Sequence, residues 1–177
     1  CSKVIGGYDF VNADDDPMDD HGHGTHVAGI AAGNGPKIKG VAPDAELYAF
    51  KVLAAGGSGS NIDIIASIER SYDLDGDGSV YGIDQEENNP KDILDVISLS
   101  LGGGIGNPND PMSQALDRAM DNGVVAVVAA GNCGPTGNPL NCLKLGDESI
   151  SNPGASRKAI TVGAVDKDLK IAGFSSR

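Results

Sequence analysis

The sequence predicts a three-layer α/β fold, in which a doubly wound and mainly parallel sheet carries helices on both faces. Nearly continuous apolar runs, typical of strands that are covered on both faces, occur at residues 47–52, 96–101, 124–129 and 160–165. Helical patterns lie between these runs, and strands that alternate with helices build parallel sheets through right-handed crossovers. We therefore expect functional groups where strands end and helices begin.

Three segments have the apolar spacing of helices. Residues 25–32 are small and apolar, whereas residues 61–72 and 112–122 each place larger apolar side chains on one face. The third segment also has recognisable ends. Asp110 is a candidate N-cap, Pro111 occupies the first helical position, and Gly123 follows the last residue.

Length and charge limit the possible classes of protein. The 177 residues predict one domain, and a net charge of −12 disfavours binding to nucleic acid while favouring bound cations such as calcium. No apolar stretch reaches the roughly 18 residues of a membrane span. The chain starts without Met or an apolar signal segment, so we expect it to begin after any targeting segment or inside a longer protein.

Two of the three cysteines flank a short loop that is rich in Gly, Pro and Asn. A disulfide between Cys133 and Cys142 would form in an oxidising compartment and contribute about 2–4 kcal/mol. Two free thiols are the alternative that this spacing leaves open. Cys1 stands at the start, and its partner could lie outside these residues.

A histidine-rich segment precedes the first helical pattern. His23 stands just before a helix of small residues, where an exposed imidazole could act as a general base. A capping or core histidine is the alternative. Zinc binding by His21, His23 and His26 is a further alternative, because three imidazoles lie within six residues.

Two predicted strands end in glycine-containing segments. The third strand runs into Gly131 and Asn132, so the asparagine amide could donate to a developing oxyanion in a cleft. The second strand runs through Ser100 and Leu101 into Gly102, which leaves backbone groups free to pair with an extended peptide. An ordinary turn is the alternative in both places.

An acidic insertion at about residues 73–89 resembles the start of a calcium-binding loop. Acidic side chains occupy alternate positions at Asp73, Asp75 and Asp77, a glycine follows, and Asp84 stands at the twelfth position. Calcium is therefore the predicted ligand, and a solvated acidic loop is the alternative. The acidic run at residues 14–20 could hold another ion but is more typical of an exposed loop.

Taken together, the motifs HGTHVAG, SLGG and AAGN, in this order, resemble the subtilisin-like serine proteases, or subtilases (peptidase family S8). GVAPDAELYAFKVL, GGSGS, AITVGAVD and FSSR agree, so the resemblance covers nearly the whole chain. The opening VIGGYDFVNADDDP is similar to the minor extracellular and cell-envelope branch. Many members of that branch carry a protease-associated domain between AAGN and FSSR, but here only about forty residues separate these motifs.

The resemblance implies roles for individual residues. His23 would be the general base, His26 structural, and Asn132 the oxyanion donor. Substrate would pair as a strand with two backbone edges, and the S1 pocket would have two walls and a base. The implied substrate-binding residues are Gly57, Ser58 and Gly59 on one edge, Ser100, Leu101 and Gly102 on the other edge and first wall, Ala130 and Gly131 on the second wall, and Ser151 at the base, before a cis proline.

Two family motifs are absent from these residues. The nucleophile motif GTSMAxP does not occur, and no aspartate stands in the D-[ST]-G turn, so none of the aspartates before His23 is assigned to the triad. We expect a partial catalytic domain that is truncated at both ends and inactive alone. The resemblance implies a secreted or cell-envelope monomeric endopeptidase that acts on proteins. The alternative is a non-catalytic homologue that binds peptides or calcium.

Overall fold

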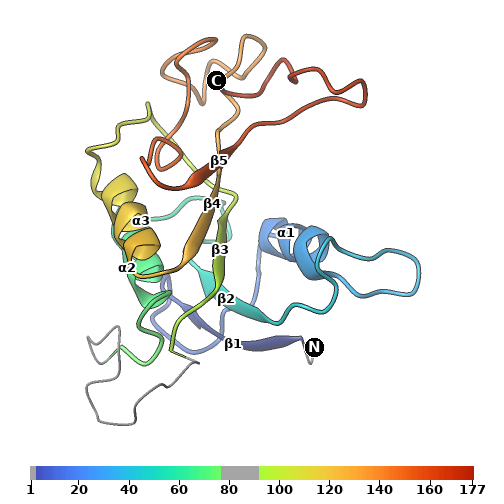
Figure 1. Cartoon of the computed structure of the whole chain (residues 1–177), viewed down its shortest axis with the longest axis vertical. Coiled ribbons are helices and arrows are strands. Elements are labelled where there is room, and N and C mark those ends of the chain that lie inside the picture. The colour runs from blue at the N-terminus through green and yellow to red at the C-terminus, as the bar shows by residue number, and fades with distance from the viewer. Residues whose placement is uncertain (1–2, 77–91) are drawn as a thin grey trace. The chain divides into compact units, whose positions relative to one another are not determined.

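The computed structural model describes residues 3–76 and 92–177 (Figure 1). Two compact units are formed, Cys1–Ser67 and Ile68–Arg177, called here the N-terminal and C-terminal units. Cys1, Asp77 and Asp84, three residues singled out from the sequence, lie outside the described residues. None of the described helices has the length and apolar character needed to cross a membrane.

The N-terminal unit contains a parallel two-stranded sheet and one complete helix. Strand β1 (Val4–Asp9) pairs with β2 (Leu47–Lys51), and helix α1 (His23–Ala32) lies between them in the chain. The sequence pattern missed β1 because two glycines interrupt its apolar run. These glycines are required by close packing, since a Cβ atom at Gly7 would lie 2.3 Å from the Ala49 carbonyl oxygen.

The C-terminal unit contains a parallel three-stranded sheet in the order β3-β4-β5. The strands are β3 (Val96–Leu99), β4 (Val125–Ala129) and β5 (Ile160–Val162). Helix α3 (Pro111–Asp121) connects β3 to β4 and lies along the sheet (Figure 1). Alternate residues of β3 and β4 are buried, and the fully buried side chains of this unit include Leu116 on α3 and Val128 on β4.

Helix α3 has the ends that the sequence predicted. The Asp110 carboxylate accepts a hydrogen bond from the Met112 backbone N–H at 3.0 Å, and Pro111 opens the helix. Gly123 adopts a φ of +96° just beyond its C-terminus, a conformation that suits glycine. Helix α2 (Asn61–Arg70) begins in the N-terminal unit and is two residues shorter than the predicted segment 61–72.

Strands β3 and β5 end earlier than their apolar runs, and the backbone beyond each of them finds other partners. After β3, Gly103 pairs with Asn152 in an isolated antiparallel bridge. After β5, the Ala164 N–H donates to the hydroxyl of Ser175 at 2.9 Å instead of to a neighbouring strand. Both deviations place loops at the carboxyl ends of the strands, where the sequence predicted functional groups.

Candidate active site

Helix α1 begins at His23, and the carboxylate of Asp19 organises this start. Asp19 accepts hydrogen bonds from the Thr25 hydroxyl at 2.6 Å, from the Thr25 N–H at 2.7 Å, and from the N–H groups of His21 and Gly22. These donors, Thr25 first, hold the pKa of Asp19 well below its usual range. His23 itself is exposed, so its imidazole is available to a ligand.

Lys51 ties the loop before α1 to the end of β1. Its ammonium lies 2.9 Å from carboxylate oxygens of both Asp9 and Asp20. Buried Asp9 also accepts from the N–H groups of Val11 and Asn12 and from the Asn12 side chain. Burial favours a higher pKa for Asp9, but the bond from Lys51 and those from Asn12 and Val11 outweigh it and lower the pKa to about 2.

These carboxylates have structural partners. Among the described residues, none of Asp9, Asp19 and Asp20 accepts a hydrogen bond from His23. The sequence analysis assigned no role to these three aspartates. The N-cap rule gave no signal for Asp19, because Asp19 stands three residues before the N-cap Gly22 and reaches the Thr25 N–H of the first helical turn only through the path of the loop.

The predicted edge at Gly57, Ser58 and Gly59 forms a tight turn in the N-terminal unit. The Gly57 N–H donates to the Ala54 carbonyl at 2.8 Å, and the Ser58 carbonyl accepts from the Ala54 N–H at 2.9 Å. Gly57 has a φ of +75°, and a Cβ atom there would lie 3.3 Å from Nε2 of His21. The turn is therefore close to the loop that leads into α1.

The second motif histidine, His26, is exposed beside a groove on α1. This groove has a volume of about 610 Å³, and its lining includes the apolar side chains of Ile30, Ile38 and Val41. All three side chains are more than half exposed. The structure does not bury His26, so the structural role that the resemblance implied remains a prediction.

Ser151 brings together the two predicted walls of the S1 pocket in the C-terminal unit. Its side chain is buried, and its N–H donates to the Ala130 carbonyl at 2.9 Å. A Cβ atom at Gly131 would lie 2.4 Å from the Ser151 hydroxyl oxygen, and one at Gly102 would lie 3.5 Å from the Ser151 Cβ. Gly131 therefore approaches the Ser151 side chain too closely for a larger residue, whereas Gly102 lies at an ordinary contact distance from Ser151 and is restricted by Asn152, whose carbonyl oxygen would lie 2.7 Å from its Cβ atom.

The loop that follows β3 is fixed to the segment that follows Ser151. Gly103 and Asn152 exchange backbone hydrogen bonds of 2.9 and 3.1 Å, and the Asn107 N–H donates to the Asn152 side chain at 2.7 Å. The peptide bond between Asn152 and Pro153 is cis, as in the family segment that residues 151–153 resemble. The end of β3 is thereby held against the predicted pocket base.

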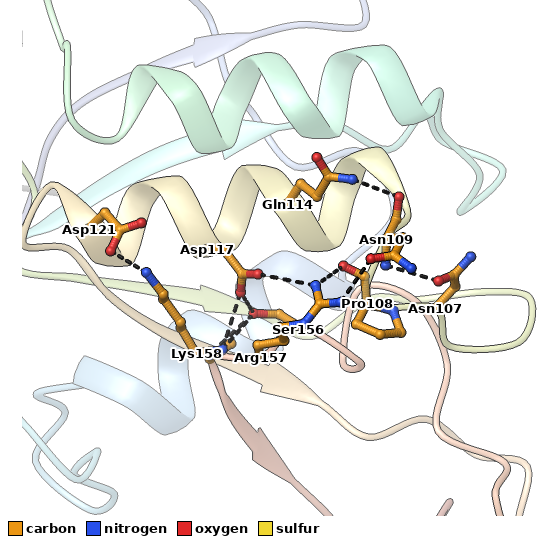
Figure 2. A network of polar contacts seen from close by, with 10 residues as sticks. Asn107, Pro108, Asn109, Gln114, Asp117, Asp121, Ser156, Arg157 and Lys158 are labelled. Carbon is orange, nitrogen blue, oxygen red and sulfur yellow. Dashed lines mark hydrogen bonds and ion pairs between the residues drawn. The ribbon is translucent and has the colours of Figure 1, made fainter.

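A second set of polar contacts supports the same loop farther along (Figure 2). The Arg157 guanidinium donates to the Pro108 carbonyl and to the Asn109 side chain, each at 2.8 Å. The Ser156 hydroxyl donates to Asp117 of α3 at 2.6 Å. Segment 152–158 is therefore bonded both to the loop and to α3, which ties the predicted pocket base to the core of this unit.

Asn132 follows β4, and its side chain is exposed while its neighbours are fixed. Gly131 has a φ of +109°, and Cys133 is buried and forms a disulfide with Cys142. The Gly131 carbonyl and the Cys133 N–H both bond to Ser176. An exposed amide on a restrained backbone is suited to donating a hydrogen bond to a ligand.

An acidic cluster lies at the start of the acidic insertion. Carboxylate oxygens of Asp73, Asp75 and Asp92 lie within 4.8 Å of one another, and no other group of three or more such ligands occurs in residues 3–76 and 92–177. The three histidines therefore do not converge on a zinc site. The regular spacing of Asp73 and Asp75 could not reveal Asp92, because Asp92 follows the acidic insertion and joins the cluster only in the folded chain.

Comparison with known proteins places these features in a family. The family model described as the subtilase family matches residues 1–177. This chain belongs to the subtilase family. Its parallel strands and intervening helices accordingly form a subtilisin-like α/β fold.

Three relatives show the extent of the similarity. The minor extracellular protease Vpr of Bacillus subtilis is 44% identical over 92% of this chain, and subtilisin DY of Bacillus licheniformis is 38% identical over 98%. The crystal structure of a cold-adapted subtilisin-like serine proteinase superposes on 98% of the chain with a TM-score of 0.71 and 28% identity. The chain spans only 18%, 54% and 52% of these three proteins, respectively.

Proposed function

We propose that residues 1–177 are part of the catalytic domain of a serine endopeptidase that hydrolyses protein substrates. The observation that carries this proposal is the convergence of Gly102 and Gly131 on Ser151, next to the exposed amide of Asn132. Membership of the subtilase family supports the reaction class. The nucleophilic serine and the triad aspartate would come from segments beyond these residues, because neither family motif occurs in them.

In this proposal, the reaction is acyl transfer to the serine followed by hydrolysis. His23 takes the proton of the attacking hydroxyl and then gives it to the leaving amine. The amide of Asn132 donates to the oxyanion of the tetrahedral intermediate. Neither role replaces a nucleophile, so residues 1–177 alone should not hydrolyse peptides efficiently.

Backbone edges and a small pocket would position the substrate. By resemblance to the family, Ser100, Leu101 and Gly102 would form one edge for an extended peptide, and residues 57–59 would form another. Ala130 and Gly131 would form the wall opposite Gly102. Ser151, in place of the glycine common in the family, would make the S1 pocket narrower and more polar.

We further propose calcium binding at the acidic cluster of Asp73, Asp75 and Asp92. Calcium prefers six to eight oxygen ligands, and the three carboxylates supply the hard, negatively charged oxygens that it requires. Asp77 and Asp84 remain candidates outside the described residues.

Calcium at 100 times its dissociation constant should raise Tm by about 5–10 °C. Asp92→Asn should reduce this increase and exposed Asp95→Asn should not; equal responses would contradict the site.

Similarity to an extracellular protease and the disulfide favour secretion or attachment to the cell envelope. We propose that the protein acts there as a monomer on protein or peptide substrates. The proposed localisation, the monomeric state, the substrates and the assignment of residues 1–177 as part of a domain would all be tested on the extended gene product.

The test uses the product of the coding sequence extended in both directions. Casein hydrolysis should be blocked by a serine-directed phosphonate and should fall to background in His23→Ala. Asn132→Ala should retain turnover reduced about 10²–10³-fold, the loss known for such a donor in a subtilisin. A folded but inactive product, or activity indifferent to His23→Ala, would instead support a non-catalytic homologue that binds peptides or calcium.

A further inference from the structure

We propose that Ser176 is a positioning residue for Asn132, a role that rests on the proposed function of Asn132 as the oxyanion donor. Ser176 lies 44 residues farther along the chain and is only 4% exposed. Its N–H donates to the carbonyl of Gly131 at 3.0 Å, and its hydroxyl oxygen accepts from the N–H of Cys133 at 2.9 Å. One buried residue thus holds the backbone on both sides of Asn132.

The backbone at Gly131 explains why this support matters. A φ of +109° is accessible to glycine at little cost, so glycine by itself does not hold the chain in this conformation. Contacts must do so. A Cβ atom at Gly131 would lie 2.9 Å from the Ser176 hydroxyl oxygen and 2.4 Å from that of Ser151, so both serines pack directly against this peptide.

The rest of the segment holds the loop beyond Asn132. The Phe174 carbonyl accepts from the Gly134 N–H at 2.8 Å, and the Gly173 carbonyl accepts from the Thr136 N–H at 3.0 Å. These bonds use main-chain atoms and would survive side-chain substitutions at these positions. Of the contacts from residues 173–176 to the loop, the hydroxyl bond of Ser176 is therefore the one that a conservative mutation removes.

Ser175 provides a matched control. It is 1% exposed, its hydroxyl oxygen accepts from the Ala164 N–H at 2.9 Å, and its O–H donates to the Ser176 carbonyl at 3.2 Å. Ser175 is therefore as buried and as well bonded as Ser176. Its partners lie after β5 and within its own segment, and it makes no hydrogen bond to residues 131–133.

The consequence for catalysis follows from the geometry of oxyanion donation. A donor stabilises the transition state only if it is already aimed at the charge that develops, so a mobile Asn132 should lower kcat more than it raises KM. Ser176→Ala leaves the buried Cys133 N–H without its acceptor, and the peptide next to Asn132 should move toward another partner. The loss should be smaller than that of removing the amide of Asn132.

The experiment measures kcat and KM on a peptide substrate in the extended gene product. The variants are Ser176→Ala, Ser175→Ala, Asn132→Ala and the double variant Ser176→Ala/Asn132→Ala. We expect Ser176→Ala to lower kcat about tenfold with KM within about twofold, and the double variant to be no slower than Asn132→Ala. Ser176→Thr keeps the hydroxyl and should retain kcat within about threefold.

Three outcomes would overturn the positioning role. One is an equal loss from Ser176→Ala with and without Asn132, and another is a loss no larger than that of Ser175→Ala. The third is a failure of Ser176→Ala to fold while Ser175→Ala folds, because Ser176 would then serve the unit as a whole. An unchanged kcat in Asn132→Ala would instead reject the oxyanion role itself, which separates the two proposals.

Discussion

The buried carboxylate of Asp9 makes the stability of the N-terminal unit depend on pH in a defined direction. Its pKa in the folded protein is about 2, below its ordinary value of 3.8. The native state therefore binds fewer protons than the unfolded state between these two values. Stability is fully present above about pH 4 and is lost as pH falls through this window.

The magnitude follows from the two pKa values. A decrease from 3.8 to about 2 corresponds to about 2.4 kcal/mol of unfolding free energy. Asp9→Asn removes this contribution and leaves Lys51 with only Asp20 as an acidic partner. The variant should therefore be less stable than the wild type at pH 6, and the difference should shrink by about 2 kcal/mol on acidification to pH 2.

Urea denaturation at several pH values between 2 and 6 would measure this difference. Asp44→Asn is the control, because it removes an exposed carboxylate from the same unit. Comparing each variant with the wild type cancels the contribution of Asp19, whose pKa is also lowered. Parallel stability profiles of Asp9→Asn and the wild type over this range would refute the reasoning.

Three further predictions concern the C-terminal unit. Replacing Cys133 and Cys142 together by serine should lower the unfolding free energy by about 2.7 kcal/mol, the chain-entropy value for a loop of about ten residues, and a reductant should destabilise only the wild type. Asp110→Ala should lower the unfolding free energy by about 1 kcal/mol, because it removes the cap of α3. Asp110→Asn keeps a capping oxygen and should retain most of this stability, so equal losses in the two variants would argue against capping. Leu116→Ala, at a fully buried position, should lower the unfolding free energy by about 2–5 kcal/mol in a denaturant titration. Leu140→Ala, at a position that is 91% exposed, should lower it by less than about 0.5 kcal/mol. Equal losses in the two variants would contradict the expected contrast.

Local patterns in the sequence were sufficient for much of the fold. The strands at Val125–Ala129 and Ile160–Val162, and the three helices found in residues 3–76 and 92–177, lie within or overlap the segments that periodicity predicted. The cap at Asp110 was also predicted correctly, because capping depends on a side chain and a backbone N–H only two residues apart. Strand β1 was missed, since its glycines are explained only by packing against β2.

The candidate site, like the fold, could be predicted only in part from local sequence. The motifs around His23 and Asn132 singled out these residues as candidates, because the order of residue types within a short segment carries the resemblance to the family. The partners that hold them were not visible: Lys51 lies 42 residues from Asp9, and Ser176 lies 43 residues from Cys133.

The sequence by itself determined the family motifs, the alternation of strands and helices, and the residue types available for chemistry. The tertiary structure decided which distant groups meet, such as Asp92 with Asp73 and Asp75, or Ser151 between Gly102 and Gly131. Local periodicity reports which face of an element is buried. It says nothing about register between strands or the path of a returning loop, and these set the contacts between residues far apart in the chain.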